Sequence, residues 1–389
     1  MNGWKQFKAK IFGTKDLASI GLGDILGSCI ASIFWFYIAA IIEPNEYGKI
    51  HYFMGIAGMA SYLALISTQN TMIVYTSKNV KIQATFYFIA LIVASISSFI
   101  LMIIFYRVDA SLLVIGYVIN NLAIGELLGK KLYSSYSKYV LTQKILTLVL
   151  GIGFYYAFGV DGIIYALVLS YAIFSVQVYR GFRESSIDFS LLRSRFGFIF
   201  NNYIINIISG AGGTIDKIII VPIVGYAILG NYSLALQVIT VLMILPQIFF
   251  KYLLPHDASG NQKIHLRKII IIISVGITVV GVTLTPYLIS TIFTKYIEAA
   301  DAIRIMSVSV FPATITMLYT SKFLGLEKSK VVLVGSLISF IILITLIILL
   351  GSVFGIVGLA VAVVLSLSGQ AVFLIVTDKM YSSNNQKTT

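Results

Sequence analysis

Charged side chains are scarce in this sequence of 389 residues. Only 11% of the residues are charged, 58% are hydrophobic, and the mean hydropathy is +0.95. A water-soluble domain carries roughly 25% charged residues. So large a shortage of charge excludes an ordinary soluble protein and indicates a chain that faces lipid along much of its length.

Cysteine and histidine are nearly missing too. The single Cys29 excludes an intramolecular disulfide and a cysteine metal cluster, and the three histidines, His51, His256 and His265, are too scattered for a metal site. The glycine-rich run at 210–213 (GAGG) is not followed by the Gly-Lys-Ser/Thr of a nucleotide-binding loop. Long polar segments that could form a catalytic domain are also missing, so we expect neither an enzyme nor a bound cofactor.

Apolar stretches long enough to cross a membrane recur along the whole chain. Each is near the ~20 residues that a helix needs to span the hydrocarbon core of a bilayer. Glycine and proline inside several of them are compatible with membrane helices, because neighbouring helices satisfy the freed backbone groups. The sequence therefore predicts an all-α polytopic membrane protein with about 12 transmembrane helices, at residues 17–42, 50–74, 82–106, 110–128, 138–158, 160–180, 197–221, 226–252, 268–293, 302–323, 329–352 and 354–377.

Positive charge gathers on alternate segments between these stretches. Of the 28 lysines and arginines, 22 lie on one set of alternate segments, 3 lie within helices, and only Lys49, Arg107 and Lys295 lie on the other set. Basic residues are retained on the cytoplasmic side of a membrane, so both termini are predicted to be cytoplasmic. The pattern predicts a multi-pass protein of the cytoplasmic membrane, and it explains the net charge of +13 without a nucleic-acid partner.

One motif occurs twice, at an offset of 196 residues. The turn at 158–162 (FGVDG) recurs at 354–358 (FGIVG), and the helix after each turn shares an alanine, a valine, a leucine and a serine. Parallel six-helix repeats, related by an axis along the membrane normal, are a common plan of secondary transporters, which bind substrate between the two halves. The sequence therefore predicts two domains, an N-terminal half at 1–190 and a C-terminal half at 191–389.

Function in such a chain must depend on polar groups at membrane depth, where a charge costs ~2.5–3.5 kcal/mol. Asp24 lies in the first predicted helix, Asn120 in the fourth and Lys144 in the fifth. Lys144 and Glu126 are also close enough to the predicted cytoplasmic face to reach water with their side chains, and Asn120 can equally well serve as a contact between helices. The densest polar group is in the seventh helix, with Asn201, Asn202, Asn206, Asp216 and Lys217.

Asp216 and Lys217 allow two interpretations. If the seventh helix continues to Val221, both charges lie inside the membrane and require partners or water. If the helix ends near Thr214, they mark the outer membrane boundary. The run at 218–221 (IIIV) favours the first interpretation, because so apolar a segment is unsuited to a free loop.

Several short motifs resemble those of the multidrug/oligosaccharidyl-lipid/polysaccharide (MOP) exporter superfamily, and within it those of the Wzx-type polysaccharide flippases. The segment at 44–48 (PNEYG) is similar to the family's Pro-x-Glu-Tyr-Gly outer turn, and 230–235 (GNYSLA) to its Gly-x-Tyr-Ser-x-Ala opening of the eighth helix. The segment at 214–220 (TIDKIII) resembles its seventh-helix aspartate with a following basic residue, and the two repeated turns resemble its Tyr-Gly-x-x-Gly turns. The chain departs from the family in having Lys217 where arginine is more usual, and in having no thirteenth or fourteenth span.

This resemblance implies a MATE/Wzx-like bundle of two six-helix repeats around a central cavity. It also implies a secondary transporter that flips a polyprenyl-(pyro)phosphate-linked oligosaccharide across the membrane by alternating access, for surface polysaccharide or glycan assembly. In such a cavity Lys217 is the first candidate for a phosphate contact and Lys144 the second. Asp24 and Asp216 are candidates to exchange H⁺ or Na⁺, and Trp35 and the asparagines to line a sugar path.

The partners that this function implies are the lipid bilayer, the lipid-linked substrate, and glycan polymerase or glycosyltransferase machinery. We expect a monomer, because the two halves already supply the internal interface. The alternative is a proton- or sodium-coupled multidrug antiporter of the same superfamily, in which Asp24 and Asp216 would couple ion entry to export of a cation. Lys217 in the same cavity would repel such a cation, which favours the flippase.

Overall fold

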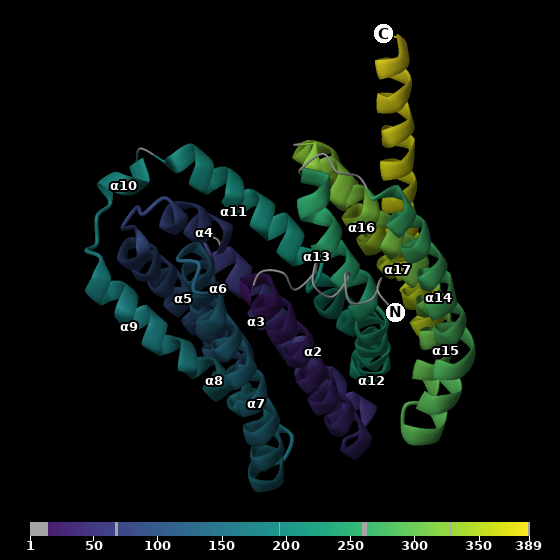
Figure 1. Cartoon of the computed structure of the whole chain (residues 1–389). Helices are drawn as coiled ribbons and strands as arrows, with labels where there is room; N and C mark the ends of the chain where they lie inside the picture. Colours follow the sequence, from purple (N-terminus) through teal and green to yellow (C-terminus); the bar gives the residue numbers. More distant parts are fainter. Residues whose placement is uncertain (1–14, 67–68, 194, 259–262, 327, 388–389) are drawn as a thin grey trace. The chain divides into compact units, whose positions relative to one another are not determined.

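The computed structural model describes residues 15–66, 69–193, 195–258, 263–326 and 328–387. Helices make up nearly all of this part of the chain, and no β-strand occurs in it (Figure 1). The expectation of an all-α polytopic protein is therefore confirmed.

The helices follow one another with short connections. The first half contains α2 (Lys15–Ile41), α3 (Pro44–Ala64), α4 (Gln69–Ser77), α5 (Gln83–Phe105), α6 (Val108–Gly129), α7 (Tyr133–Phe158), α8 (Asp161–Tyr171), the 3-10 turn η1 (Ala172–Phe174) and α9 (Ser175–Glu184). The second half contains α10 (Ser190–Arg193), α11 (Phe196–Ala211), α12 (Ile215–Leu242), α13 (Ile244–Ala258), α14 (Ile264–Ile292), α15 (Ile297–Ser307), α16 (Val310–Gly325) and α17 (Ser329–Lys387).

Eight continuous helical segments of the described chain are long and apolar enough to cross a membrane, and the number rises to ten if each of two bent pairs is one span. These pairs, α3 with α4 and α15 with α16, each bend by 43°. The backbone of α17 breaks at Gly355 and that of α12 at Gly225, so each of these helices belongs to two spans. With these breaks, all the predicted stretches correspond to helical runs, the seventh to α11 with the start of α12 and the eighth to the rest of α12 with α13.

The repeated motif has the same backbone structure at both of its positions. Gly159 has a φ of 70° and Gly355 a φ of 55°, in the left-handed region that residues with side chains rarely adopt. A Cβ atom at Gly162 would lie 2.5 Å from a carbonyl oxygen of the preceding helix, and one at Gly358 would lie 2.1 Å from the equivalent oxygen. The first glycine of each pair therefore permits the turn, and the second permits the next helix to pack directly against the preceding one.

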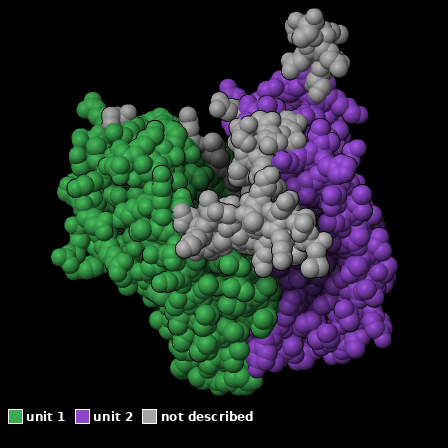
Figure 2. Space-filling model, viewed as in Figure 1, with its two compact units in different colours: residues 1–35, 52–215 green, residues 36–51, 216–389 purple. Residues whose placement is uncertain are grey.

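Two compact units divide the chain (Figure 2). The N-terminal unit comprises Met1–Trp35 and Tyr52–Ile215, and the C-terminal unit comprises Phe36–His51 and Asp216–Thr389. The predicted halves at 1–190 and 191–389 follow the sequence repeat. Packing instead assigns α10 and α11 to the N-terminal unit, and the end of α2 with the first part of α3 to the C-terminal unit. The chain passes from one unit to the other near residues 35, 51 and 215.

Within the C-terminal unit, the first turns of α3 cross α12 with no side chain between the two backbones. A Cβ atom at Gly48 would lie 1.9 Å from the carbonyl oxygen of Tyr226, and one at Gly230 would lie 1.9 Å from that of Pro44. The contact is reciprocal, because each glycine faces the carbonyl group four residues before the other glycine. Both glycines belong to the segments at 44–48 and 230–235, so two separated sequence motifs meet at one helix crossing.

Candidate functional site

In the N-terminal unit, α2 and α7 approach closely because glycines line their contact. A Cβ atom at Gly23 would lie 2.8 Å from the Oγ of Ser137, and one at Gly27 would lie 3.5 Å from the Cγ of Lys144. Small residues of this kind allow two membrane helices to pack backbone to backbone. The polar side chains that the two helices carry are consequently brought to one interface.

Asp24 of α2 forms a hydrogen bond across this interface. The hydroxyl group of Tyr136, at the start of α7, donates to Oδ1 of Asp24 at 2.6 Å. Tyr136 is buried and Asp24 is partly buried. This hydrogen bond joins the carboxylate of Asp24 on α2 to α7.

Lys144 lies eight residues beyond Tyr136, about 12 Å further along α7. Its stem lies against α2 at Gly27 and its side chain is partly buried. Among the described residues, the structure gives Lys144 no ion pair and no hydrogen bond. A lysine at membrane depth without a carboxylate partner is energetically costly, and a bound anion would remove that cost.

Trp35 and Asn120 lie elsewhere in the N-terminal unit. Trp35 is buried near the end of α2, where it packs edge-on against Phe34 with 4.9 Å between ring centroids. Asn120 is partly buried on α6. Their proposed role in a sugar path stays a prediction.

The asparagines of α11 differ in their surroundings. Asn202 donates its amide to the carbonyl oxygen of Phe198 at 2.9 Å, one turn earlier on the same helix. Asn206 is partly buried, and the side chain of Asn201 lies outside the described residues. One N–H of the Asn202 side-chain amide is therefore used within its own helix and is not available to a ligand.

Asp216 and Lys217 lie at the start of a helix that follows a turn. α11 ends at Ala211, residues 212–214 form a turn, and α12 begins at Ile215 and continues beyond Val221 to the break at Gly225. One helix thus ends just before Thr214, and a new helical run continues past Val221, so whether the two charges lie inside the membrane or at its outer boundary stays a prediction. Asp216 and Lys217 lie in the first turn of a new helix, where the helix dipole favours a carboxylate.

Asp216 is the centre of a buried polar cluster in the C-terminal unit. It is only 5% exposed. Its carboxylate accepts a hydrogen bond from Tyr232 at 3.0 Å and forms an ion pair with the Nζ of Lys217 at 3.2 Å. The backbone amide of Lys217 also donates to it at 2.8 Å. Lys217 therefore pairs with a neighbouring acid, whereas no described acid pairs with Lys144.

His51 is a further buried group of the C-terminal unit. It lies on α3, near the point where that helix leaves the unit, and packs against Tyr47 with 4.5 Å between ring centroids. The sequence provides no sign of this environment for an isolated histidine. Tyr232 could have been found from its place in the motif at 230–235, but nothing near Tyr136 in the sequence indicates that it contacts Asp24.

Two other buried carboxylates are already paired. Glu126 is fully buried and accepts hydrogen bonds from Tyr87 at 2.7 Å and Lys130 at 2.6 Å. The expectation that Glu126 reaches water is therefore wrong, because partners inside the protein compensate its charge. Asp257 is likewise buried and pairs with Arg267 at 2.5 Å. These hydrogen bonds and ion pairs hold helices of one unit together, and the paired carboxylates leave little net charge for a ligand.

Arg107, in the connection between α5 and α6, joins a charge cluster with the buried Asp109 at the start of α6 and the exposed Asp161 at the start of α8. Arg107 donates to both carboxylate oxygens of Asp109, at 3.0 and 2.7 Å, and lies 3.0 Å from Asp161. The hydrogen bonds to Asp109 raise the pKa of Arg107, and partial burial opposes that shift. The cluster fastens the connection at 105–108 to the start of α8.

Comparison with known proteins identifies the fold. No family model matches the chain, and no curated protein sequence does. An inward-facing multidrug resistance MATE family transporter of the MOP superfamily matches with a TM-score of 0.72 and 15% identity, over 94% of this chain and 96% of that one. The outward-facing conformation of such a transporter matches with a TM-score of 0.65 and 16% identity, over 98% and 99% of the two chains.

A third similar structure is a MOP superfamily transporter from Pyrococcus furiosus. Its binding pocket is described as having reversed polarity, which suggests a different function for that protein. It matches with a TM-score of 0.60 and 16% identity, over 96% of each chain. At these identities the likeness establishes the fold: this chain is a multi-pass membrane protein with the architecture of MATE transporters.

Proposed function

We propose that this protein is a secondary transporter that flips a polyprenyl-(pyro)phosphate-linked oligosaccharide across the cytoplasmic membrane by alternating access. The observation that carries the proposal is the partly buried Lys144, which has no acidic partner among the described residues. A phosphate group that crosses hydrocarbon requires a cation, and a membrane cation without a countercharge requires an anion. The substrate and the site are therefore complementary in charge.

The surroundings of the two lysines reverse the order in which the sequence ranks them. Lys217 is held 3.2 Å from Asp216, so a phosphate would have to compete with that carboxylate. Lys144 has its stem against Gly27 and no such competitor in the described chain. We therefore assign the principal phosphate contact to Lys144. Lys217 is a secondary contact, which a phosphate can make only by competing with Asp216.

The carboxylates provide a route for ion coupling in the same proposal. Asp24 is bonded to the neutral Tyr136, and Asp216 to Tyr232 and Lys217. Either acid could bind H⁺ or Na⁺ in one state and release it in the other.

The second candidate function is a proton- or sodium-coupled multidrug antiporter. Two observations favour it: the fold matches multidrug resistance MATE transporters, and Asp24 would attract a cationic drug. Lys144 and Lys217 oppose it, because both place positive charge at membrane depth.

The decisive experiment measures movement of a labelled polyprenyl-linked oligosaccharide across proteoliposome membranes. We expect Lys144→Ala to slow movement by about 10-fold or more, the loss that removal of a charged hydrogen bond produces. Lys144→Arg should retain most of the rate, and Lys217→Ala should slow movement less than Lys144→Ala. Arg304→Ala is the matched control, because the side chain of Arg304 is 59% exposed and pairs with the exposed Asp301.

The same proteoliposomes distinguish the antiporter. Proton- or sodium-driven efflux of a cationic dye that is lost in Asp24→Asn, with no movement of the oligosaccharide lipid, would establish the antiporter instead. Movement of the lipid at an unchanged rate in Lys144→Ala would retain the flippase but overturn the role assigned to Lys144.

A further inference from the structure

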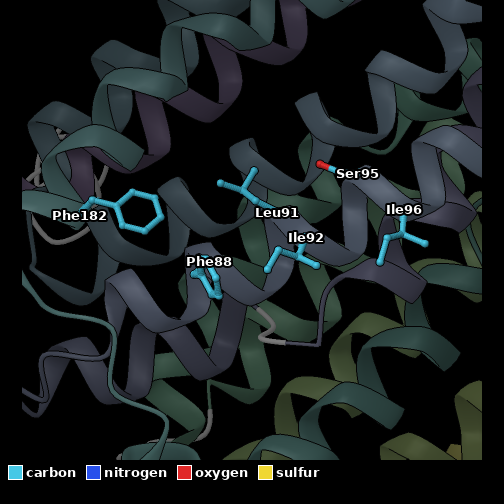
Figure 3. A pocket seen from close by; sticks show the side chains of 6 residues that line it. All are labelled: Phe88, Leu91, Ile92, Ser95, Ile96 and Phe182. Atoms are coloured by element: carbon cyan, nitrogen blue, oxygen red, sulfur yellow. The ribbon is translucent and has the colours of Figure 1, made fainter.

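A groove with a volume of about 330 Å³ lies between α5 and α9 in the N-terminal unit (Figure 3). Five of its lining residues are on α5 and occupy one helix face, since they follow the spacing i, i+3, i+4, i+7 and i+8. α9 contributes a single aromatic ring. The lining residues are Phe88, Leu91, Ile92, Ser95, Ile96 and Phe182.

This groove opens on an exposed apolar face of its unit. Ile92, Ile96 and Phe182 are 46%, 55% and 37% exposed, whereas Ala90 and Ala94 on another face of α5 are fully buried. The hydroxyl group of Ser95 is the single polar group among the six lining side chains. From Phe88 to Ile96 the groove extends about 12 Å along the helix, which is most of the ~15 Å hydrocarbon depth of one leaflet.

Basic side chains lie at the end of the groove that is predicted to be cytoplasmic. The backbone amide of Ala84 donates to the Oγ of Ser185 at 2.9 Å, which joins the start of α5 to the end of α9. Lys81 lies three residues before Ala84, and Arg183 lies two residues before Ser185; both side chains are exposed. Two exposed cations thus lie near the predicted cytoplasmic end of the apolar groove, and the guanidinium of Arg183 lies 5.9 Å from the ring centroid of Tyr179.

The acidic residues of this segment are engaged by other groups. Glu184 forms an ion pair with Lys130. Asp188 accepts hydrogen bonds from the amide and hydroxyl groups of Ser190 at 2.9 and 2.6 Å, which lower its pKa. Neither acid pairs with Lys81 or Arg183 in the described part of the chain.

We propose that the groove binds one hydrocarbon chain of an anionic phospholipid of the cytoplasmic leaflet, with its phosphate between Lys81 and Arg183. An apolar channel of leaflet depth accommodates the chain, and basic residues beside a membrane helix attract anionic headgroups. Arginine also binds phosphate oxygens through two parallel hydrogen bonds. The site is separate from Lys144 and does not depend on the proposed transport function.

Native mass spectrometry of the full chain, released from bilayers of equal phosphatidylglycerol and phosphatidylcholine, tests this site. We expect phosphatidylglycerol to be retained preferentially, and Lys81→Ala with Arg183→Ala to reduce that preference about 10-fold or more, since each basic residue contributes about fivefold. Lys268→Ala with Lys330→Ala is the matched control, because these lysines are exposed in the C-terminal unit.

Filling the groove tests where the chain binds. Ser95→Trp should abolish lipid retention, and Ile96→Trp provides a second groove-filling variant if the first does not fold. Val149→Trp is the control, because Val149 is 60% exposed on α7. Equal retention of the two lipids by the natural protein, or full retention in a folded groove-filled variant, would overturn the proposal. Displacement of phosphatidylglycerol by a lower concentration of polyprenyl phosphate would replace it with a substrate-entry site.

Discussion

Gly48 and Gly230 show how much a single residue can determine in this fold. A side chain at either position would overlap a carbonyl oxygen of the facing helix, at 1.9 Å. The overlap is with backbone and not with the end of a flexible side chain, so the helices themselves would have to separate. The motifs that contain these glycines are visible in the sequence, but their mutual contact is not.

We expect Gly48→Ala and Gly230→Ala each to destabilise the protein by about 3 kcal/mol or more, because overpacking against rigid backbone cannot relax locally. Gly153→Ala on α7 is the control, since nothing lies within 4 Å of a Cβ atom there. That change should be neutral or stabilise the helix by up to about 1 kcal/mol. Thermal unfolding in detergent measures the stability of all three variants. A Gly48→Ala protein with the same Tm as the natural protein would contradict the close contact between α3 and α12.

At the scale of helices, ion pairs join equivalent elements of the two repeats. Lys130, just after α6, pairs with Glu184 of α9, and Lys322 of α16 pairs with Asp378 of α17 at 2.6 Å. In each repeat the fourth predicted span is thus fastened to the sixth at the same end. The pattern of charge in the sequence places these residues on one side of the membrane, but only packing pairs them.

The buried pair of Asp257 and Arg267 offers the clearest test of whether an ion pair between helices stabilises its unit. Their side chains are 2% and 15% exposed, and Ser321 also donates to Asp257 at 2.5 Å. We expect Asp257→Asn to cost about 3–5 kcal/mol, because Arg267 would be left buried without its countercharge. This corresponds to a fall of about 5 °C in Tm for a chain of this length.

Asp301→Asn is the control for that measurement. Asp301 is 65% exposed and lies 3.6 Å from Arg304, so its loss should change the free energy of unfolding by less than about 1 kcal/mol. Equal Tm values for the two variants would show that the Asp257 cluster does not stabilise the unit.

For the whole molecule, the distribution of lysine and arginine predicts that both termini are cytoplasmic. After Cys29, which is exposed, is replaced by serine, single cysteines can report the orientation. We expect an impermeant maleimide to label cysteines at Lys49 and Lys295 in intact cells, and those at Lys138 and Lys330 only after permeabilisation. The opposite pattern would invert the topology and place the proposed lipid groove in the other leaflet.

Sequence alone determined the class of fold, the approximate positions of the spans and the repeated turn at Gly159 and Gly355. These features follow from local properties, because hydrophobic length, charge asymmetry and the need for glycine at positive φ act over a few residues. The sequence also located the polar residues at membrane depth. It could not show their partners, since Asp24 and Tyr136 are 112 residues apart.

Tertiary structure decided which charges are compensated and where the chain changes units. It paired Lys217 with Asp216, buried Glu126 among its partners and left Lys144 without an acid in the described chain. It also placed α11 in the N-terminal unit, although the sequence repeat assigns that helix to the second half. Such outcomes depend on contacts between distant segments, because the energy of a buried charge is determined by its neighbours in space and not by those in sequence.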